Sequence, residues 1–115
     1  TAHIFSSGYN ISTVSGITKY LKKFDSMIGL NNVCVFHIND SKYKLGAKRD
    51  EHMGIGYGNI FNTNSGLKSL KTIKQLCIKK NIPMILETHS AAKIDSEGSK
   101  GMKGYEYEID LIKNL

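Results

Sequence analysis

Residues 33–39 (VCVFHIN) and residues 83–88 (PMILET) are the two stretches that decide the fold. Each is a short, nearly continuous apolar run, which is typical of a strand buried on both faces. Side chains alternate between the two faces of a strand. His37 and Glu87 therefore lie near the ends of their strands, on the face opposite to the one that carries Phe36 and Ile38. We expect Phe36 and Ile38 to pack against helices.

Helical patterns alternate with these strands. Apolar residues recur at helical spacing over residues 13–29, 65–80 and 105–115, with Gly29, Ser65 and Asn81 as expected helix boundaries. We expect Tyr105, Ile109 and Ile112 to face inward in the last helix, and residues 1–12, 40–64 and 89–104 to be loops. Alternating strands and helices predict a parallel α/β sheet with helical crossovers. Two strands cannot form a stable sheet alone. We therefore expect residues 1–115 to be the C-terminal portion of one (β/α)8 barrel domain of about 250 residues, without its N-terminal part.

The composition is basic, with 16 Lys and Arg against 10 Asp and Glu and a formal net charge of +6. A nucleic-acid partner and a lysine-biased genome explain this balance equally well, since 15 of the basic residues are Lys. The single arginine, Arg49, is suited to bidentate phosphate recognition. Cys34 and Cys77 lie in apolar runs, which predicts buried thiols in a reducing, intracellular compartment. No apolar run approaches the ~18 residues of a membrane span.

Histidines and carboxylates gather where the predicted strands end. His37 and Glu87 close neighbouring strands, the edge at which barrel enzymes place their active sites. Asp50 and His52 are two residues apart and point the same way in an extended segment, and His3 is a further candidate. Imidazole and carboxylate together are typical zinc ligands. Taken singly, each has a simpler interpretation: a hydrogen-bonded core histidine, an ion pair of Glu87 with Lys42, or a solvated turn.

Four segments resemble the endonuclease IV family of zinc-dependent apurinic/apyrimidinic endonucleases. They are residues 1–9 (TAHIFSSGY), 37–42 (HINDSK), 45–56 (LGAKRDEHMGIG) and 83–88 (PMILET). They occur in the family's order and spacing over most of the chain. The resemblance implies a xylose isomerase-like TIM barrel with three zinc ions at its C-terminal face.

By position, His3, His37, Asp50, His52 and Glu87 match family zinc ligands. The resemblance assigns His3, Asp50 and His52 to one ion, and His37 and Glu87 to another. The remaining ligands and the residues that intrude into DNA belong to the family's N-terminal part. Glu51 departs from the family, which has an arginine between the aspartate and the histidine. His89 matches no family ligand, and we expect it in a loop facing solvent or DNA.

The implied reaction is hydrolysis of the phosphodiester on the 5′ side of abasic sites in double-stranded DNA, during base-excision repair, by a monomeric enzyme. The chemistry would be metal-centred. Arg49, Lys42 and Lys48 are candidates for contacts to DNA phosphates. Asn39 and Asp40, which follow a ligand, are candidates for orienting it.

Two other functions fit parts of the pattern. A sugar isomerase or epimerase of related barrel fold also uses His, Asp and Glu around divalent metals, but it does not explain the three ligands His3, Asp50 and His52. A barrel that binds DNA without cutting it would not need all five ligands intact. Two more histidines and a glutamate at upstream strand ends would favour the nuclease.

Overall fold

The computed structural model describes residues 1–88 and 102–115, with the side chains of residues 102 and 103 left aside. The elements in chain order are α1 (Ala2–Ser6), α2 (Val14–Met27), a 3-10 helix η1 (Leu30–Asn32), β1 (Phe36–Ile38), β2 (Asp40–Ser41), β3 (His52–Met53), α3 (Asn64–Lys80), β4 (Met84–Leu86) and α4 (Met102–Lys113). No helix within these ranges combines the length and apolar character needed to span a bilayer.

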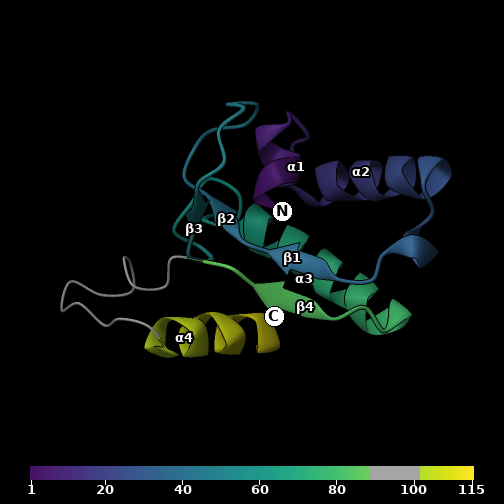
Figure 1. Cartoon of the computed structure of the whole chain (residues 1–115). Coiled ribbons are helices and arrows are strands. Elements are labelled where there is room, and N and C mark those ends of the chain that lie inside the picture. The colour runs from purple at the N-terminus through teal and green to yellow at the C-terminus, as the bar shows by residue number, and fades with distance from the viewer. Residues whose placement is uncertain (89–101) are drawn as a thin grey trace.

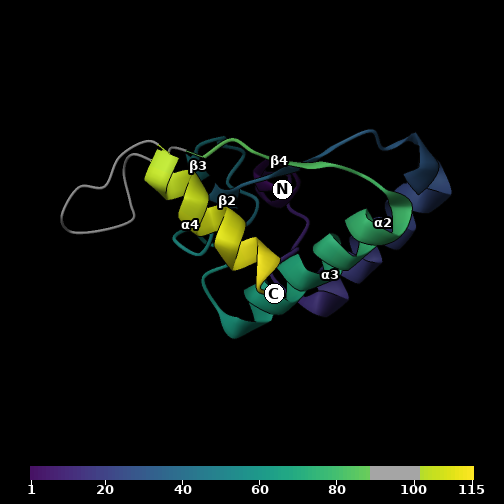
Figure 2. The same ribbon diagram turned by 90° about the horizontal axis from the view of Figure 1, so that it is seen from below.

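Strands β1 and β4 pair in parallel, with His37 opposite Ile85. Helix α3 provides the crossover between them. In Figures 1 and 2 the long helices lie on one side of this pair, and its other side is open. Phe36 and Ile38 face the helices and are buried, whereas Val35 and Ile85 remain about half exposed on the open side. The predicted alternation of strand side chains is thereby confirmed.

The core lies between the β1–β4 sheet and helices α2 and α3, and these two helices also pack against each other. Its most deeply buried side chains are aliphatic and aromatic: Ile11, Ile17, Ile38, Ile55, Ile60, Phe61, Leu70 and Ile73. Each long helix begins at a threonine whose hydroxyl accepts a hydrogen bond from the backbone N–H three residues on, Thr13 from Gly16 and Thr63 from Gly66. Helix α3 ends at Asn81, which adopts the left-handed conformation with φ 54°.

Several sequence predictions were wrong in detail. The cap of α3 is Thr63 rather than Ser65, and residues 2–6 form a helix rather than a loop. The predicted loop 40–64 contains a short antiparallel pair, in which Asp40 lies opposite Met53 and Ser41 opposite His52. Cys77 is buried as predicted, but Cys34 is exposed. The expected loop 89–104 lies mostly outside the described residues.

The closing helix α4 differs from the prediction at one of the three residues expected to face inward. Ile112 is buried, but Ile109 is 41% exposed, and Glu108 is completely buried in its place. The stripe of residues facing the core therefore contains a carboxylate at position 108 where an isoleucine at position 109 was predicted.

Candidate metal centre

All five predicted ligands lie together at the carboxyl ends of β1 and β4. His37 belongs to β1 and Glu87 directly follows β4, so the parallel register sets their separation. His37 Nε2 lies 3.0 Å from Glu87 Oε2. These two residues are called the strand pair below. Both side chains extend from the open side of the sheet.

A second set of three residues adjoins the strand pair. His3 from α1, Asp50 from the loop and His52 from β3 place one ligand atom each within 4.8 Å of one another. His3 Nε2 is 2.6 Å from Asp50 Oδ2, and His52 Nε2 is 3.1 Å from Asp50 Oδ1. These residues are called the three-residue group. One carboxylate is thus held between two imidazole nitrogens.

His52 joins the two sets. Its ring stands edge-on to both His3 and His37, with ring centroids 5.8 and 5.7 Å apart. Its Nδ1 lies 2.9 Å from the backbone carbonyl oxygen of Glu87. A carbonyl oxygen only accepts hydrogen bonds, so Nδ1 carries a proton, and Nε2 is the ring nitrogen that faces the Asp50 carboxylate.

This arrangement fits a cation. The Nε2 of His52 is sealed from solvent and has no aligned hydrogen-bond partner among residues 1–88 and 102–115. It nevertheless faces the Asp50 carboxylate, and two acceptors at this distance repel each other unless a positive charge lies between them. A metal ion at this position would use both lone pairs, and the bond from His52 Nδ1 to the Glu87 carbonyl is the outer support that metal-binding histidines usually have.

The electrostatics of His37 also suit a metal ligand. Burial lowers the pKa of His37, against the opposing effect of the Glu87 carboxylate. A histidine with a lowered pKa is neutral at pH 7, and only the neutral ring offers a lone pair to a metal.

Asn39, predicted to orient a ligand, links the strand end to the helix that carries His3. Its Oδ1 accepts from the backbone N–H of Ala2 at 2.8 Å, and its backbone N–H donates to Thr1 Oγ1 at 2.9 Å. Asn39 is completely buried. The start of α1 is therefore fixed to the end of β1, and His3 is carried over the strand ends.

Asp40, the other residue predicted to orient a ligand, instead bonds to the loop that follows β3. Its carboxylate accepts backbone N–H groups of Gly56, Ile60 and Phe61 at 2.7–3.2 Å. Burial raises the pKa of Asp40, although hydrogen bonds from backbone N–H groups, that of Ile60 foremost, act in the opposite direction. The side chain holds the loop 56–61 against the β2–β3 pair rather than contacting His37.

The three basic residues predicted to contact phosphates are exposed on the loop between β2 and β3. The Arg49 guanidinium stacks over the Tyr43 ring, 4.8 Å from its centroid. Lys42 forms an ion pair with Glu51 rather than with Glu87. Lys48 has a positive φ of 54°, and its backbone N–H donates to Ser6 O at 3.1 Å.

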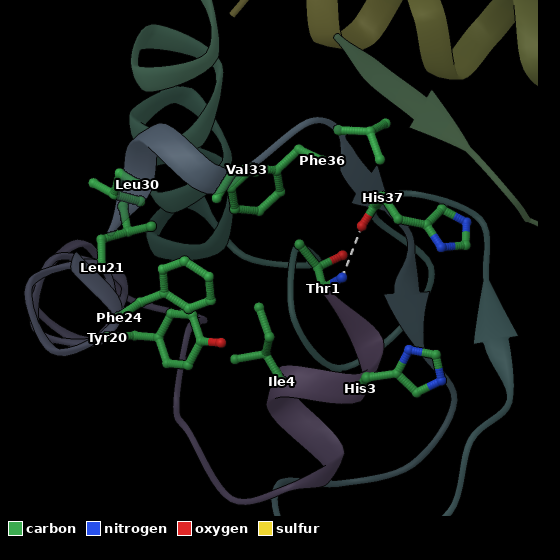
Figure 3. Close-up of a pocket in the computed structure, with 11 residues that line it drawn as sticks. Thr1, His3, Ile4, Tyr20, Leu21, Phe24, Leu30, Val33, Phe36 and His37 are labelled. Carbon is green, nitrogen blue, oxygen red and sulfur yellow. Dashed lines mark hydrogen bonds between the residues drawn. The ribbon is translucent and has the colours of Figure 1, made fainter. Parts of the chain in front are cut away.

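A hollow of about 250 Å³ opens between α1, α2 and β1. Its walls are mainly apolar, with Tyr20 and Phe24 from α2 and Phe36 from β1. Figure 3 shows the rings of His3 and His37 at its edge, both directed away from these apolar side chains. The hollow therefore borders the candidate metal centre, with His3 and His37 at the boundary between the two. A second hollow, lined by His52, Glu87 and other residues of the site, opens directly on the ligands.

Sequence reasoning missed three residues next to the site. Glu108 and Tyr105 of α4 both bond to Thr88, the residue after Glu87. The sequence contains one signal for Glu108: it lies between Tyr105 and Ile109, two residues of the same helix that are predicted to face inward. It was overlooked because charged residues are rarely buried unless they are paired. His89 lies outside the described residues.

Comparison with known proteins gives a consistent result. The family model described as xylose isomerase-like TIM barrel matches residues 1–115. The chain is 36% identical over 115 residues to probable endonuclease 4 of Haloquadratum walsbyi, covering 100% of this chain and 36% of that protein. It is 40% identical over 114 residues to probable endonuclease 4 of Halalkalibacterium halodurans, covering 99% of this chain and 35% of that protein. The chain thus spans about a third of the length of these relatives.

Solved structures agree. The chain superposes on the crystal structure of AsfvAP:AG with a TM-score of 0.75 and 25% identity, covering 99% of this chain and 38% of the other. Endonuclease IV from Thermus thermophilus gives a TM-score of 0.72 at 23% identity, with 98% and 35% covered. The predicted α/β barrel fold is confirmed.

Proposed function

Because this chain belongs to the endonuclease IV family of xylose isomerase-like TIM barrels, we propose that it is the C-terminal, metal-holding portion of a zinc-dependent DNA-repair endonuclease. The complete enzyme would hydrolyse the phosphodiester 5′ to abasic sites in double-stranded DNA, inside the cell and as a monomer. Its barrel would be closed by strands outside residues 1–115, in agreement with the open side of the β1–β4 pair (Figure 2).

Different residues would bind different zinc ions. His3, Asp50 and His52 would hold one zinc ion, and His37 with Glu87 would contribute to a second; a third ion would depend on residues elsewhere in the protein. Zinc supplies Lewis-acid chemistry for phosphodiester hydrolysis. The observation that carries the proposal is the Asp50 carboxylate held between two histidine Nε2 atoms, 2.6 and 3.1 Å away.

The loop residues complete the interaction with DNA. The Arg49 guanidinium lies over the Tyr43 ring and the residue is exposed, so its N–H groups can be reached by a phosphate. Lys48 is exposed nearby and adds positive charge. Lys42 is paired with Glu51, so its contact with a phosphate would compete with this ion pair. These contacts position the DNA backbone and read no sequence.

The decisive experiment is an assay of the complete protein on duplex DNA containing one abasic site. We expect cleavage 5′ to that site, loss of cleavage with a chelator, and recovery when zinc is restored. Uncleaved but bound DNA would instead favour a DNA-binding barrel. Interconversion of aldose and ketose sugars without DNA cleavage would favour the isomerase.

A further inference from the structure

Glu108 is a buried acidic side chain that the proposed function does not use. It lies on α4, on the helix side of the β1–β4 sheet, and is completely buried. Its Oε1 accepts the backbone N–H of Ile55 at 2.7 Å, and its Oε2 accepts the Thr88 hydroxyl at 2.6 Å. Each carboxyl oxygen of Glu108 thus accepts one hydrogen bond from a donor on another segment of the chain.

The two partners of Glu108 stand next to two proposed ligands. Thr88 directly follows Glu87, and Ile55 comes three residues after His52. Gly54, which lies between His52 and Ile55, packs closely against the Glu108 side chain. A Cβ built at Gly54 would lie 3.2 Å from Glu108 Oε1. One carboxylate therefore joins the chain segment behind Glu87 to the segment behind His52.

Tyr105, one turn earlier on α4, strengthens the same connection. Its hydroxyl donates to the Thr88 backbone carbonyl at 2.9 Å. Thr88 is thus held at its side chain by Glu108 and at its backbone by Tyr105. The backbone carbonyl of the adjacent Glu87 accepts the hydrogen bond from His52 Nδ1. The direction of this carbonyl depends on where Thr88 is fixed.

A buried carboxylate is unfavourable unless its hydrogen bonds are satisfied. An apolar residue at position 108 would fill the stripe on α4 equally well, yet it could not hold both segments. We propose that Glu108 is a positioning residue: through Thr88 and Ile55 it fixes the Glu87 carboxylate and the His52 ring in the orientation that binds metal. This inference rests on the proposed zinc site and adds α4 to the elements that support it.

The test uses the complete protein and four variants. Thr88→Val removes one hydrogen bond without changing size, and Thr88→Ser restores the hydroxyl. Glu108→Ala removes the carboxylate, and Glu106→Ala is the matched control, because Glu106 is exposed on the same helix. The measurements are zinc affinity by chelator competition, the visible absorption of the cobalt-substituted protein, and the Tm of the metal-free protein.

We expect Thr88→Val and Glu108→Ala to weaken zinc binding by about 10–100-fold, as usual for residues that support ligands, and to change the cobalt spectrum. Thr88→Ser and Glu106→Ala should resemble the parent protein. A Thr88→Val protein with a lower Tm but unchanged zinc affinity and cobalt spectrum would overturn the inference, even if Glu108→Ala fails to fold. If the parent protein binds no zinc, the proposed function itself fails.

Discussion

The strand pair and the three-residue group occupy the same end of the molecule but are built differently. His37 and Glu87 extend from paired parallel strands, so the backbone register determines their spacing. His3, Asp50 and His52 come from a short helix, a loop and a two-residue strand. Their spacing depends on side chains such as Asn39 that tie these segments together.

This difference implies two kinds of sensitivity. The backbone ladder fixes the strand ends that carry the strand pair, so most changes in surrounding side chains should disturb it little. The exceptions are Thr88 and Glu108, which we propose orient Glu87. The three-residue group should be disturbed by the loss of one buried polar side chain. His52 belongs to the three-residue group, and its ring is also hydrogen-bonded to the backbone of Glu87. His52 therefore links the three-residue group to the strand pair.

The largest effect should follow His52→Ala. The substitution removes one proposed ligand of the three-residue group and the ring that separates it from the strand pair. We expect the complete protein to lose zinc, measured by mass spectrometry, and abasic-site cleavage to fall by more than about 100-fold, beyond the loss typical of supporting residues. His3→Ala, which leaves the contact with Glu87 intact, should lose less zinc. Full zinc content in His52→Ala would disprove the ligand assignment.

A smaller and more selective effect should follow Asn39→Ala. The substitution leaves the buried N–H of Ala2 without its acceptor, which destabilises the protein by about 1–3 kcal/mol. Since α1 is then loosened, we expect weaker metal binding by the three-residue group and little change at the strand pair. Thermal unfolding and zinc titration of the complete protein measure both effects.

Asn31→Ala is the control for Asn39→Ala, because Asn31 is exposed and bonds only to the Lys80 side chain among the interactions described. Equal loss of metal from both sets in Asn39→Ala would show that the strand pair is not independently held.

The same contrast explains what the sequence could predict. The strands and the two long helices have strong apolar periodicity, and His37 and Glu87 follow from alternation along a strand. Helix α1 and the β2–β3 pair are too short for periodicity, and they exist because Asn39 and Asp40 bond to distant backbone groups. Nothing local indicates such bonds, so the three-residue group was predicted through the family resemblance and the spacing of Asp50 and His52.

Helix α4 shows the other limit. Its pattern of apolar residues is compatible with either Ile109 or Glu108 facing the core, and hydrophobicity favours Ile109. The structure buries Glu108 because Ile55 and Thr88 offer two hydrogen-bond donors. A prediction from one helix alone contains no information about donors on other segments.

The smallest predicted effect concerns the loop outside both sets. Arg49→Ala removes a guanidinium that stacks on Tyr43 and faces solvent, so zinc content should not change. If Arg49 contacts a phosphate, DNA affinity should fall at all sequences alike, and the slope of log affinity against log salt concentration should decrease by about 1. Lys68→Ala, on the exposed part of α3, is the control for loss of one positive charge. An unchanged salt slope in Arg49→Ala would exclude the phosphate contact, and loss of zinc would show that the loop also supports Asp50, its neighbour in the chain.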